Sequence, residues 1–334
     1  MTTKPAGRVA MESEMARAAP DALATFDKVQ DAAREVADSL RASGRLVLLG
    51  MGASHAVNRM VEPLFRGLGI DAVALPLSEQ LNAGLPLAGK TVLLASQSGE
   101  SAEVLRWLST ARAGQVFGLS LEPHATLARS VPTLVAAGGT ERAFAGTRSL
   151  TLTLAMHLAV LAQLGQDPAP AHAVLHNPPA PDVTPAVCAL SQVRAVATSG
   201  RRLQGIAEAA ALGLCELGRA PAFAIEGGQF RHGPMELAGP DLGVVLFASD
   251  EPDAALVTGL ARSLAEAGAP VVLFDASAAP ALPGVTTVAL PRLAGMAAIL
   301  AILPAMQRFT LDHAARRASD VGTPRRSSKI SRTE

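Results

Sequence analysis

The sequence is poor in aromatic residues and in charge of either sign. Of its 334 residues 3% are aromatic, none is Tyr, and 29 Lys and Arg residues balance 29 Asp and Glu residues. A chain without net charge exerts no long-range attraction on nucleic acid or on an anionic membrane, so we expect neither as a partner. Because 49% of the residues are hydrophobic, the composition excludes a disordered chain and predicts a core of Ala, Leu and Val.

Cysteines and long hydrophobic runs are also scarce. Cys188 and Cys215 are too few for a disulfide framework and lack metal-site spacing, so we expect reduced thiols, a cytoplasmic protein and no metal. The first residues lack the apolar stretch of a secretory signal. The longest apolar runs, residues 150–164 and 293–306, are shorter than the roughly 20 residues of a membrane span and predict buried helices.

From residue 44 onward, short apolar runs alternate with longer helical patterns. Uninterrupted runs of β-branched and Leu residues are typical of parallel strands that are buried on both faces and joined by helices. The predicted strands are residues 46–49, 73–77, 92–95, 116–119, 134–136, 195–198, 244–247, 271–274 and 287–290. Residues 90–108 and 241–264 also share a strand, an Ala-Ser turn and an acidic helix start. We therefore predict an α/β fold with a duplicated, doubly wound parallel sheet.

Composition also suggests where the domains begin and end. We expect an N-terminal helical segment over residues 1–43, a first domain over 44–165, a second domain over 191–318 and a tail over 319–334. The stretch 166–190 contains six prolines and is predicted to be a linker or an irregular crossing. Ligands of such sheets bind beyond the carboxyl ends of the strands, and candidate residues are sought there.

The strongest local signal follows the predicted strand at 92–95. The segment reads Ser96, Gln97, Ser98, Gly99, Glu100 and Ser101, and a helix is predicted over 102–108. Hydroxyl groups and the N–H groups of a first helical turn can bind a phosphate without a basic patch. One serine would suffice for an N-cap. Three serines and a glutamine therefore favour phosphate binding over capping alone.

A glycine-containing turn follows the first predicted strand. It contains Gly50 and Gly52, but His55 occupies the place of the third glycine of a dinucleotide fingerprint. We therefore expect no nicotinamide or flavin cofactor. A compact turn that brings Ser54 to the same phosphate is the preferred interpretation.

Two residues of the second half could perform acid–base chemistry. Glu216 lies on an Ala- and Leu-rich helix, where a carboxylate is either paired for structural reasons or tuned as a base. His232 lies between Gly-rich turns and could transfer protons near neutral pH. Each alone is more often structural than catalytic. The basic tail is by composition a solvated terminus.

Together these motifs resemble the SIS-domain phosphosugar family. That family includes the isomerase part of glucosamine-6-phosphate synthase, stand-alone glucosamine-6-phosphate deaminases and fructosamine-phosphate deglycases. The resemblance is carried by residues 11–14 (M-x-x-E), 50–54, 96–101 (similar to S-Q-S-G-E-T), 141–151, 216, 231–234 (H-G-P) and 320–334. Lys329 lies five residues before the end, like the Lys of the family's P-R-N-L-A-K-S-V-T-V-E ending. The resemblance thus makes the tail part of the site.

The resemblance implies two tandem SIS domains, each a doubly wound parallel sheet flanked by helices, and a role for each site residue. A homodimer with a shared active site and a sugar phosphate ligand is implied, with no cofactor. The implied phosphate ligands are Ser54, Ser96, Gln97, Ser98 and Ser101, and the implied sugar contacts are Gly52 and Thr147. Glu216 would move a proton between C1 and C2, and His232, from the neighbouring subunit, would assist ring opening. Lys329 would engage the open-chain sugar as a Schiff base or as a cation.

The implied activity is isomerisation of an (amino)hexose 6-phosphate between aldose and ketose, with release of ammonia or an amine. A non-catalytic sugar-phosphate-binding regulator and a plain phosphosugar isomerase stay open as alternatives. Gly213 replaces a Lys that the synthases carry three residues before Glu216, and Gly146 replaces a Ser of the family's A-S-T-K. No part of the chain resembles a glutaminase domain, so glutamine-dependent synthesis is not expected.

Overall fold

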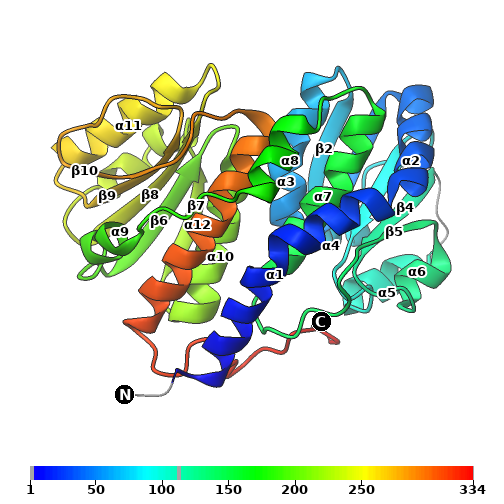
Figure 1. The fold of residues 1–334 in the computed structure, drawn as a ribbon, viewed down its shortest axis with the longest axis horizontal. Coiled ribbons are helices and arrows are strands. Elements are labelled where there is room, and N and C mark those ends of the chain that lie inside the picture. The colour runs from blue at the N-terminus through cyan, green and yellow to red at the C-terminus, as the bar shows by residue number, and fades with distance from the viewer. Residues whose placement is uncertain (1–3, 111–113, 334) are drawn as a thin grey trace. The chain divides into compact units, whose positions relative to one another are not determined.

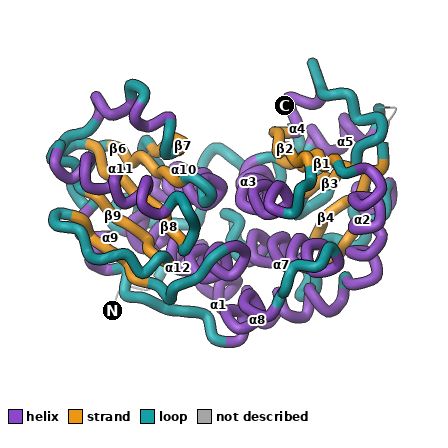
Figure 2. Tube along the Cα trace, turned by 90° about the horizontal axis from the view of Figure 1, so that it is seen from above, coloured by secondary structure: helices purple, strands orange, loops and turns teal. Residues whose placement is uncertain are grey.

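The computed structural model describes residues 4–110 and 114–333, which form two compact units. The first unit comprises residues 12–176 together with the end of the chain from Pro324. The second unit comprises residues 177–323 together with the beginning of the chain up to Met11. Helices flank a sheet in each unit (Figure 1), and Figure 2 shows the strands lying between these helices. Among the described residues, no helix is long and apolar enough to cross a membrane.

The first unit contains a five-stranded parallel sheet of order β2-β1-β3-β4-β5. Its strands are β1 (Arg45–Gly50), β2 (Asp71–Pro76), β3 (Thr91–Ala95), β4 (Gln115–Ser120) and β5 (Thr133–Val135). Its helices are α1 (Ala6–Lys28, which starts in the second unit), α2 (Gln30–Ser43), α3 (Gly52–Gly67), α4 (Leu77–Asn82), α5 (Ala102–Leu108), α6 (Thr126–Ser130), α7 (Arg148–Gln163) and α8 (Ala169–His176). Every residue of β3 is buried, as expected of a central parallel strand.

The second unit contains a five-stranded parallel sheet of order β10-β9-β8-β6-β7. Its strands are β6 (Ala195–Gly200), β7 (Ala222–Glu226), β8 (Leu242–Ser249), β9 (Val271–Ala276) and β10 (Val285–Ala289). Its helices are α9 (Thr184–Ala189), α10 (Gln204–Gly218), η1 (Gln229–Arg231), η2 (Pro234–Leu237), α11 (Ala254–Glu266) and α12 (Gly295–Ala315). Counted along the chain, the strands of both sheets have the same spatial order, second-first-third-fourth-fifth. This shared order supports the predicted duplication.

The structure confirms the α/β class, the parallel sheets and all nine predicted strands. The two apolar runs form buried helices within α7 and α12, also as predicted. Strand β7 is not predicted from the sequence, because this edge strand (AFAIE) is half-buried throughout and lacks a run of β-branched residues. A second difference concerns the Pro-rich stretch, which contains helices α8 and α9 rather than an irregular crossing. Pro185 lies in the first turn of α9, where no backbone N–H is needed.

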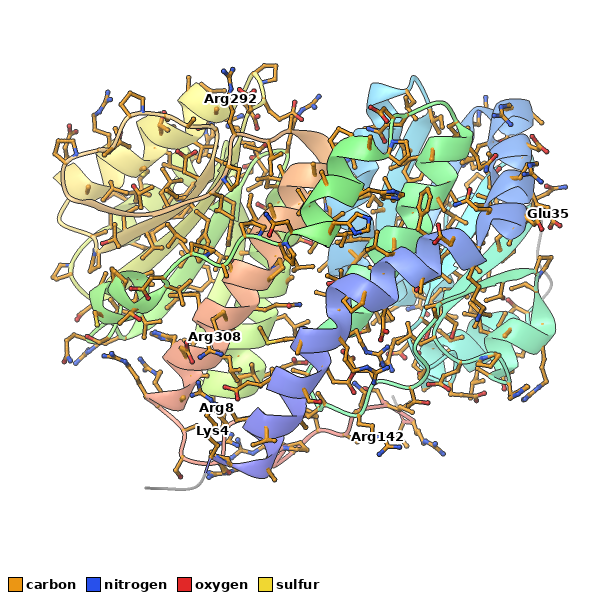
Figure 3. The ribbon with its side chains drawn as sticks, viewed as in Figure 1. Lys4, Arg8, Glu35, Arg142, Arg292 and Arg308 are labelled. Carbon is orange, nitrogen blue, oxygen red and sulfur yellow. The ribbon has the colours of Figure 1, made fainter. Side chains whose placement is uncertain are left out.

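An ion-pair cluster holds the beginning of the chain to the second unit. Asp312 of α12 accepts hydrogen bonds from Arg8 at 2.5 Å and from Arg308 at 2.8 Å. Both arginines are labelled in Figure 3. Further along the chain, α2 ends at Gly44, whose φ of 61° is a left-handed conformation that glycine adopts without strain. The turn at Gly44 leads directly into β1.

Candidate functional site

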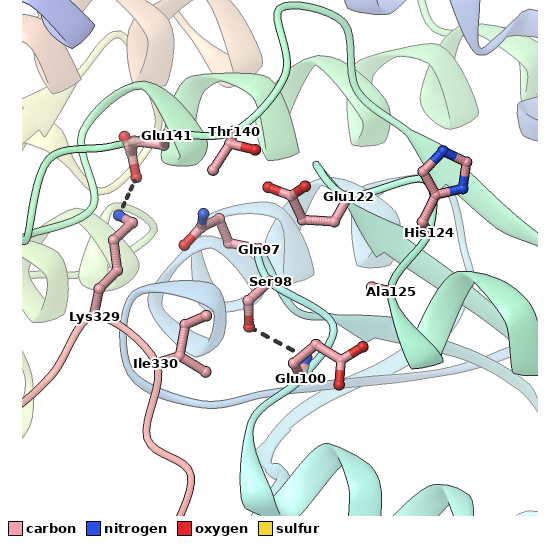
Figure 4. A pocket seen from close by; sticks show the side chains of 10 residues that line it. All are labelled: Gln97, Ser98, Glu100, Glu122, His124, Ala125, Thr140, Glu141, Lys329 and Ile330. Carbon is pink, nitrogen blue, oxygen red and sulfur yellow. Dashed lines mark hydrogen bonds and ion pairs between the residues drawn. The ribbon is translucent and has the colours of Figure 1, made fainter.

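A pocket of about 430 Å³ lies in the first unit, beyond the carboxyl ends of β3, β4 and β5 (Figure 4). Three loops and the C-terminal segment line it. The lining residues are Gln97, Ser98, Glu100, Glu122, His124, Ala125, Thr140, Glu141, Lys329 and Ile330. This is the edge of a parallel sheet at which ligands bind.

The loop after β3 is a tight turn that its own serines hold. Ser96 Oγ accepts a hydrogen bond from the Gly99 N–H at 3.1 Å, and Ser98 Oγ accepts one from the Glu100 N–H at 3.2 Å. Gly99 has a φ of +64°, and a Cβ there would lie 2.7 Å from the Ala125 Cβ, so the turn requires glycine. A hydroxyl that accepts one hydrogen bond can still donate its own proton to a ligand.

Glu100 fastens this loop to the next one. Its Oε1 accepts a hydrogen bond from the Thr126 N–H at 2.5 Å, at the start of α6. The side chain of Glu100 therefore caps a neighbouring helix, as acidic side chains commonly do. The first N–H group of α5, on Ala102, is also engaged, since it donates to the Ser331 carbonyl at 2.9 Å. Part of the predicted N–H donor set thus binds the C-terminal segment.

The C-terminal segment brings Lys329 to the pocket. Its Nζ donates to Glu141 Oε2 at 3.0 Å and to the Ala143 carbonyl at 2.5 Å (Figure 4). Lys329 and the neighbouring Ile330 line the pocket together with Gln97 and Ser98. Among the predicted phosphate and tail residues, these are the ones that the structure brings into one pocket.

Glu141 is the most heavily hydrogen-bonded side chain of the site and is 1% exposed. Its Oε1 accepts from the Thr147 N–H and hydroxyl at 2.9 and 3.1 Å and from the Ser149 N–H at 3.0 Å. Its Oε2 accepts from the Ser149 hydroxyl at 2.8 Å, in addition to Lys329. Burial by itself raises the pKa of Glu141. The Lys329 ammonium and the hydrogen bonds from Ser149 and Thr147 outweigh burial and hold this pKa below its ordinary value.

A buried ion-pair network fixes the same loop from the other side. The Arg148 side chain is fully buried and binds Glu14 at 2.6 Å and Asp21 at 2.9 Å, with a further bond to the Gly139 carbonyl. Glu14 also accepts a hydrogen bond from the N–H of Arg142, which is labelled in Figure 3. The M-x-x-E segment near the N-terminus therefore has a structural role, because its Glu anchors the loop that carries Glu141.

The remaining predicted residues of the first unit lie outside the pocket lining. Gly52 and Ser54 are in the first turn of α3, and Ser54 is half-buried. Ser101 precedes α5, and Ser96 is 8% exposed behind the loop. Thr147 is 1% exposed and binds Glu141, so it orients that carboxylate. Direct sugar contacts of Gly52 and Thr147 stay predictions.

The predicted acid–base residues belong to the second unit. Glu216 is half-buried near the end of α10, and His232 is exposed directly after η1. Glu226 accepts hydrogen bonds from the N–H groups of Gly228 and Gln229 at 2.7 and 2.9 Å, which fixes the Gly-rich turn before His232. A Cβ at Gly213 would lie 3.0 Å from Thr310 Cγ2 of α12, so glycine at this position permits close packing of α10 on α12.

Four polar residues of the pocket that follow β4 and β5 had no role predicted from the sequence. These residues are Glu122, His124, Thr140 and Glu141. They follow β4 and β5, and the carboxyl ends of those predicted strands were the available signal. In the described part of the chain, no three His, Cys, Asp or Glu side chains are grouped to hold a metal ion.

With this geometry established, comparisons define the class of fold. No family model and no curated protein matches the sequence. The C-terminal domain of glucosamine-fructose-6-phosphate aminotransferase from Francisella tularensis matches in structure with a TM-score of 0.83 and 18% identity, over 94% of this chain and 98% of that one.

Two further solved structures extend the likeness. Tagatose-6-phosphate ketose/aldose isomerase from Escherichia coli matches with a TM-score of 0.78 and 19% identity, over 98% of this chain and 100% of that one. Glucosamine-6-phosphate deaminase from Thermotoga maritima matches with a TM-score of 0.69 and 19% identity, over 92% and 98%. The chain therefore has the fold of phosphosugar isomerases, which confirms at the level of the fold the resemblance that the motifs predicted.

Proposed function

We propose that this chain is an SIS-type phosphosugar-processing enzyme. It isomerises an (amino)hexose 6-phosphate between aldose and ketose and releases ammonia or an amine, as a glucosamine-6-phosphate deaminase does. The two units are then two tandem SIS domains, and the protein is a cytoplasmic homodimer with a shared active site. The fold supports the class, and one of the matching structures is a glucosamine-6-phosphate deaminase.

One observation carries the proposal. The segment that ends the chain places Lys329 in the pocket of Gln97 and Ser98, about 230 positions away in sequence. Polar hydroxyl and amide groups suit a phosphate, and an ammonium group suits the oxygen atoms of an open-chain sugar. The family resemblance requires that the serine loop and Lys329 lie in the same pocket.

The phosphate would be bound by Ser54, Ser96, Gln97, Ser98 and Ser101. Gly52 and Thr147 complete the proposed sugar site. In this assignment the hydroxyl and N–H groups neutralise the anion by hydrogen bonding, which agrees with a chain of zero net charge.

The proposed reaction has two proton-transfer steps, ring opening and the transfer of a proton from C2 to C1, and each has its own residue. His232 of the neighbouring subunit assists ring opening, and Glu216 removes the C2 proton of the 2-amino aldose and returns it to C1. This leaves a C2 imine, which water converts into the ketose and ammonia. Lys329 stabilises the oxygen at the carbonyl end while charge develops there.

An assay of ammonia release from glucosamine 6-phosphate tests the proposal. Glu216→Gln should lower turnover at least about 100-fold with sugar-phosphate binding retained, because proton transfer loses its base. The matched control is Glu208→Gln on the same helix, which should turn over normally. Undiminished turnover in the Glu216 variant would sink the assignment.

Two other outcomes identify the alternatives. Tight binding of sugar phosphates without turnover of any amino sugar phosphate would indicate a non-catalytic regulator. Turnover confined to sugars without an amine would indicate a plain phosphosugar isomerase. A melting-temperature panel of sugar phosphates would select the substrates to assay, since a ligand of the native state raises the melting temperature.

A further inference from the structure

Two carboxylates of the pocket have opposite surroundings. Glu141 is buried and binds Lys329, Thr147 and Ser149. Glu122 lines the same pocket half-buried, and no described residue hydrogen-bonds or ion-pairs with its carboxylate. Both carry negative charge near the place where we expect an anion. Their contacts nevertheless indicate different roles.

We propose that Glu141 is a positioning residue for anion binding, which holds the Lys329 ammonium and with it the C-terminal segment 324–333 at the pocket. The proposal rests on the proposed function for the identity of the anion, a sugar phosphate. It assigns Glu141 no contact with the substrate. Its effect is exerted through Lys329.

The contacts of Glu141 show why it can hold a mobile side chain in one place. Four hydrogen bonds from Thr147 and Ser149 fix both of its oxygen atoms from within the loop. The buried Arg148 network with Glu14 and Asp21 fixes the loop itself. A carboxylate that is already oriented binds an ammonium without further loss of its own freedom.

The contacts of Lys329 show what Glu141 controls. The Lys329 side chain is 23% exposed and reaches a carboxylate that is fully covered. Its Nζ donates to two acceptors on one loop, while the Ser331 carbonyl accepts from the Ala102 N–H on α5. The segment is thus fastened on both sides of the serine loop. Loss of the ion pair should release Lys329 and loosen this segment.

The sign of one substitution separates positioning from simple charge. If Glu141 acted only as a nearby negative charge, Glu141→Gln would strengthen anion binding, because repulsion would be removed. If Glu141 positions Lys329, the same substitution weakens anion binding, because the cation leaves the pocket. Glu122→Gln is the matched control, and it should strengthen anion binding by about threefold.

The first experiment titrates inorganic phosphate and glucosamine 6-phosphate into the full-length variants by calorimetry. We expect Glu141→Gln and Lys329→Met each to weaken binding about tenfold and the double variant to be no weaker than Lys329→Met alone. Lys329→Arg, which keeps the charge, should recover most of the affinity. Tighter binding by Glu141→Gln, or additive losses in the double variant, would overturn the proposal.

The second experiment needs no ligand and therefore stands if the proposed function fails. Trypsin can cleave after the exposed Arg326 only when the segment that follows it, with Lys329, moves away from Glu141. We expect cleavage there to accelerate about tenfold in Glu141→Gln and in Lys329→Met, with an unchanged rate in Glu122→Gln. Melting temperatures report whether the Glu141 variant folds, and Lys329→Met removes the same ion pair from the exposed side. Equal cleavage in all variants would contradict the proposal.

Discussion

The two units share their strand order but differ in the side chains of the loop that follows the third strand of each sheet. In the first unit, the loop after β3 offers Ser96, Gln97 and Ser98 next to a pocket. In the second unit, the corresponding loop after β8 reads Asp250, Glu251, Pro252 and Asp253. A duplicated topology thus presents hydroxyl groups on one sheet and carboxylates on the other.

The acidic loop of the second unit is engaged in holding its own neighbours. Glu251 binds Arg202 at 2.9 Å and accepts from the Gly295 N–H at 3.1 Å. Asp250 binds Arg292, at the edge of this unit in Figure 3. These carboxylates would repel a phosphate, whereas the serine loop adds no charge. The topology therefore determines at which edge of the sheet a ligand can bind, and the side chains of the loop determine which ligand fits.

The largest expected effect concerns the ion pairs of the two units. Arg148→Ala in the first unit should lower the free energy of unfolding by about 3 to 5 kcal/mol, because it leaves the buried Glu14 without its cation and Asp21 with Arg17 alone. Arg202→Ala removes a pair that is 46% exposed on the Arg side, and should cost less than about 1 kcal/mol. Urea unfolding of both variants measures the difference. Equal losses would remove the distinction between the two networks.

The next effect exchanges chemistry between the two loops. Ser98→Asp should weaken phosphate binding at least about 100-fold, because a carboxylate enters the pocket while it still accepts the Glu100 N–H. The mirror substitution, Asp250→Ser in the second unit, should leave phosphate affinity unchanged. Calorimetric titration of both variants with phosphate measures the two affinities. Tighter binding by Asp250→Ser would place the anion on the other sheet, because a repelling carboxylate would have been removed from its site.

The strands and the serine loop could be predicted from sequence because their signals are local. A run such as residues 92–95 followed by Ser96 contains both the buried strand and the polar turn. Glu141 could not be assigned in this way, since its partner Lys329 is 188 positions away. Burial of Arg148 also depends on Glu14 and Asp21 of another helix. Only tertiary structure joins such residues.

Acid should destabilise both units through buried histidines. Burial lowers the pKa of His157 in the first unit to about 3. Burial, with the charges of Arg317 and Arg316, lowers the pKa of His313 in the second unit to about 4. The unfolded chain binds these protons near pH 6.5, so each group lowers the free energy of unfolding by about 1.4 kcal/mol per pH unit below that value. This loss continues down to the respective folded pKa.

Unfolding measured between pH 7 and pH 5 checks this slope. His157→Leu should reduce the slope of the free energy of unfolding against pH by the contribution of one proton, and His313→Leu should do the same. A slope that persists in the double variant His157→Leu/His313→Leu would assign it to other groups.

The smallest expected effect compares helix packing in the two units. Gly213→Ala on α10 should lower stability by about 1 kcal/mol, because the new Cβ would lie 3.0 Å from Thr310 Cγ2. Gly67→Ala at the end of α3 meets open space and should raise stability by about 0.5 kcal/mol. Thermal melting of the two variants tests the opposite signs. A gain in both would mean that α10 and α12 can move apart freely.

The proposed function requires a sugar phosphate bound at the serine loop of the first unit. A crystal structure of the full chain with glucosamine 6-phosphate tests this claim most directly. We expect the phosphate within hydrogen-bonding distance of Gln97 and Ser98, with Lys329 close to the sugar. A phosphate bound instead at the loop after β8, or a serine loop left unoccupied while the ligand lies elsewhere, would contradict the account.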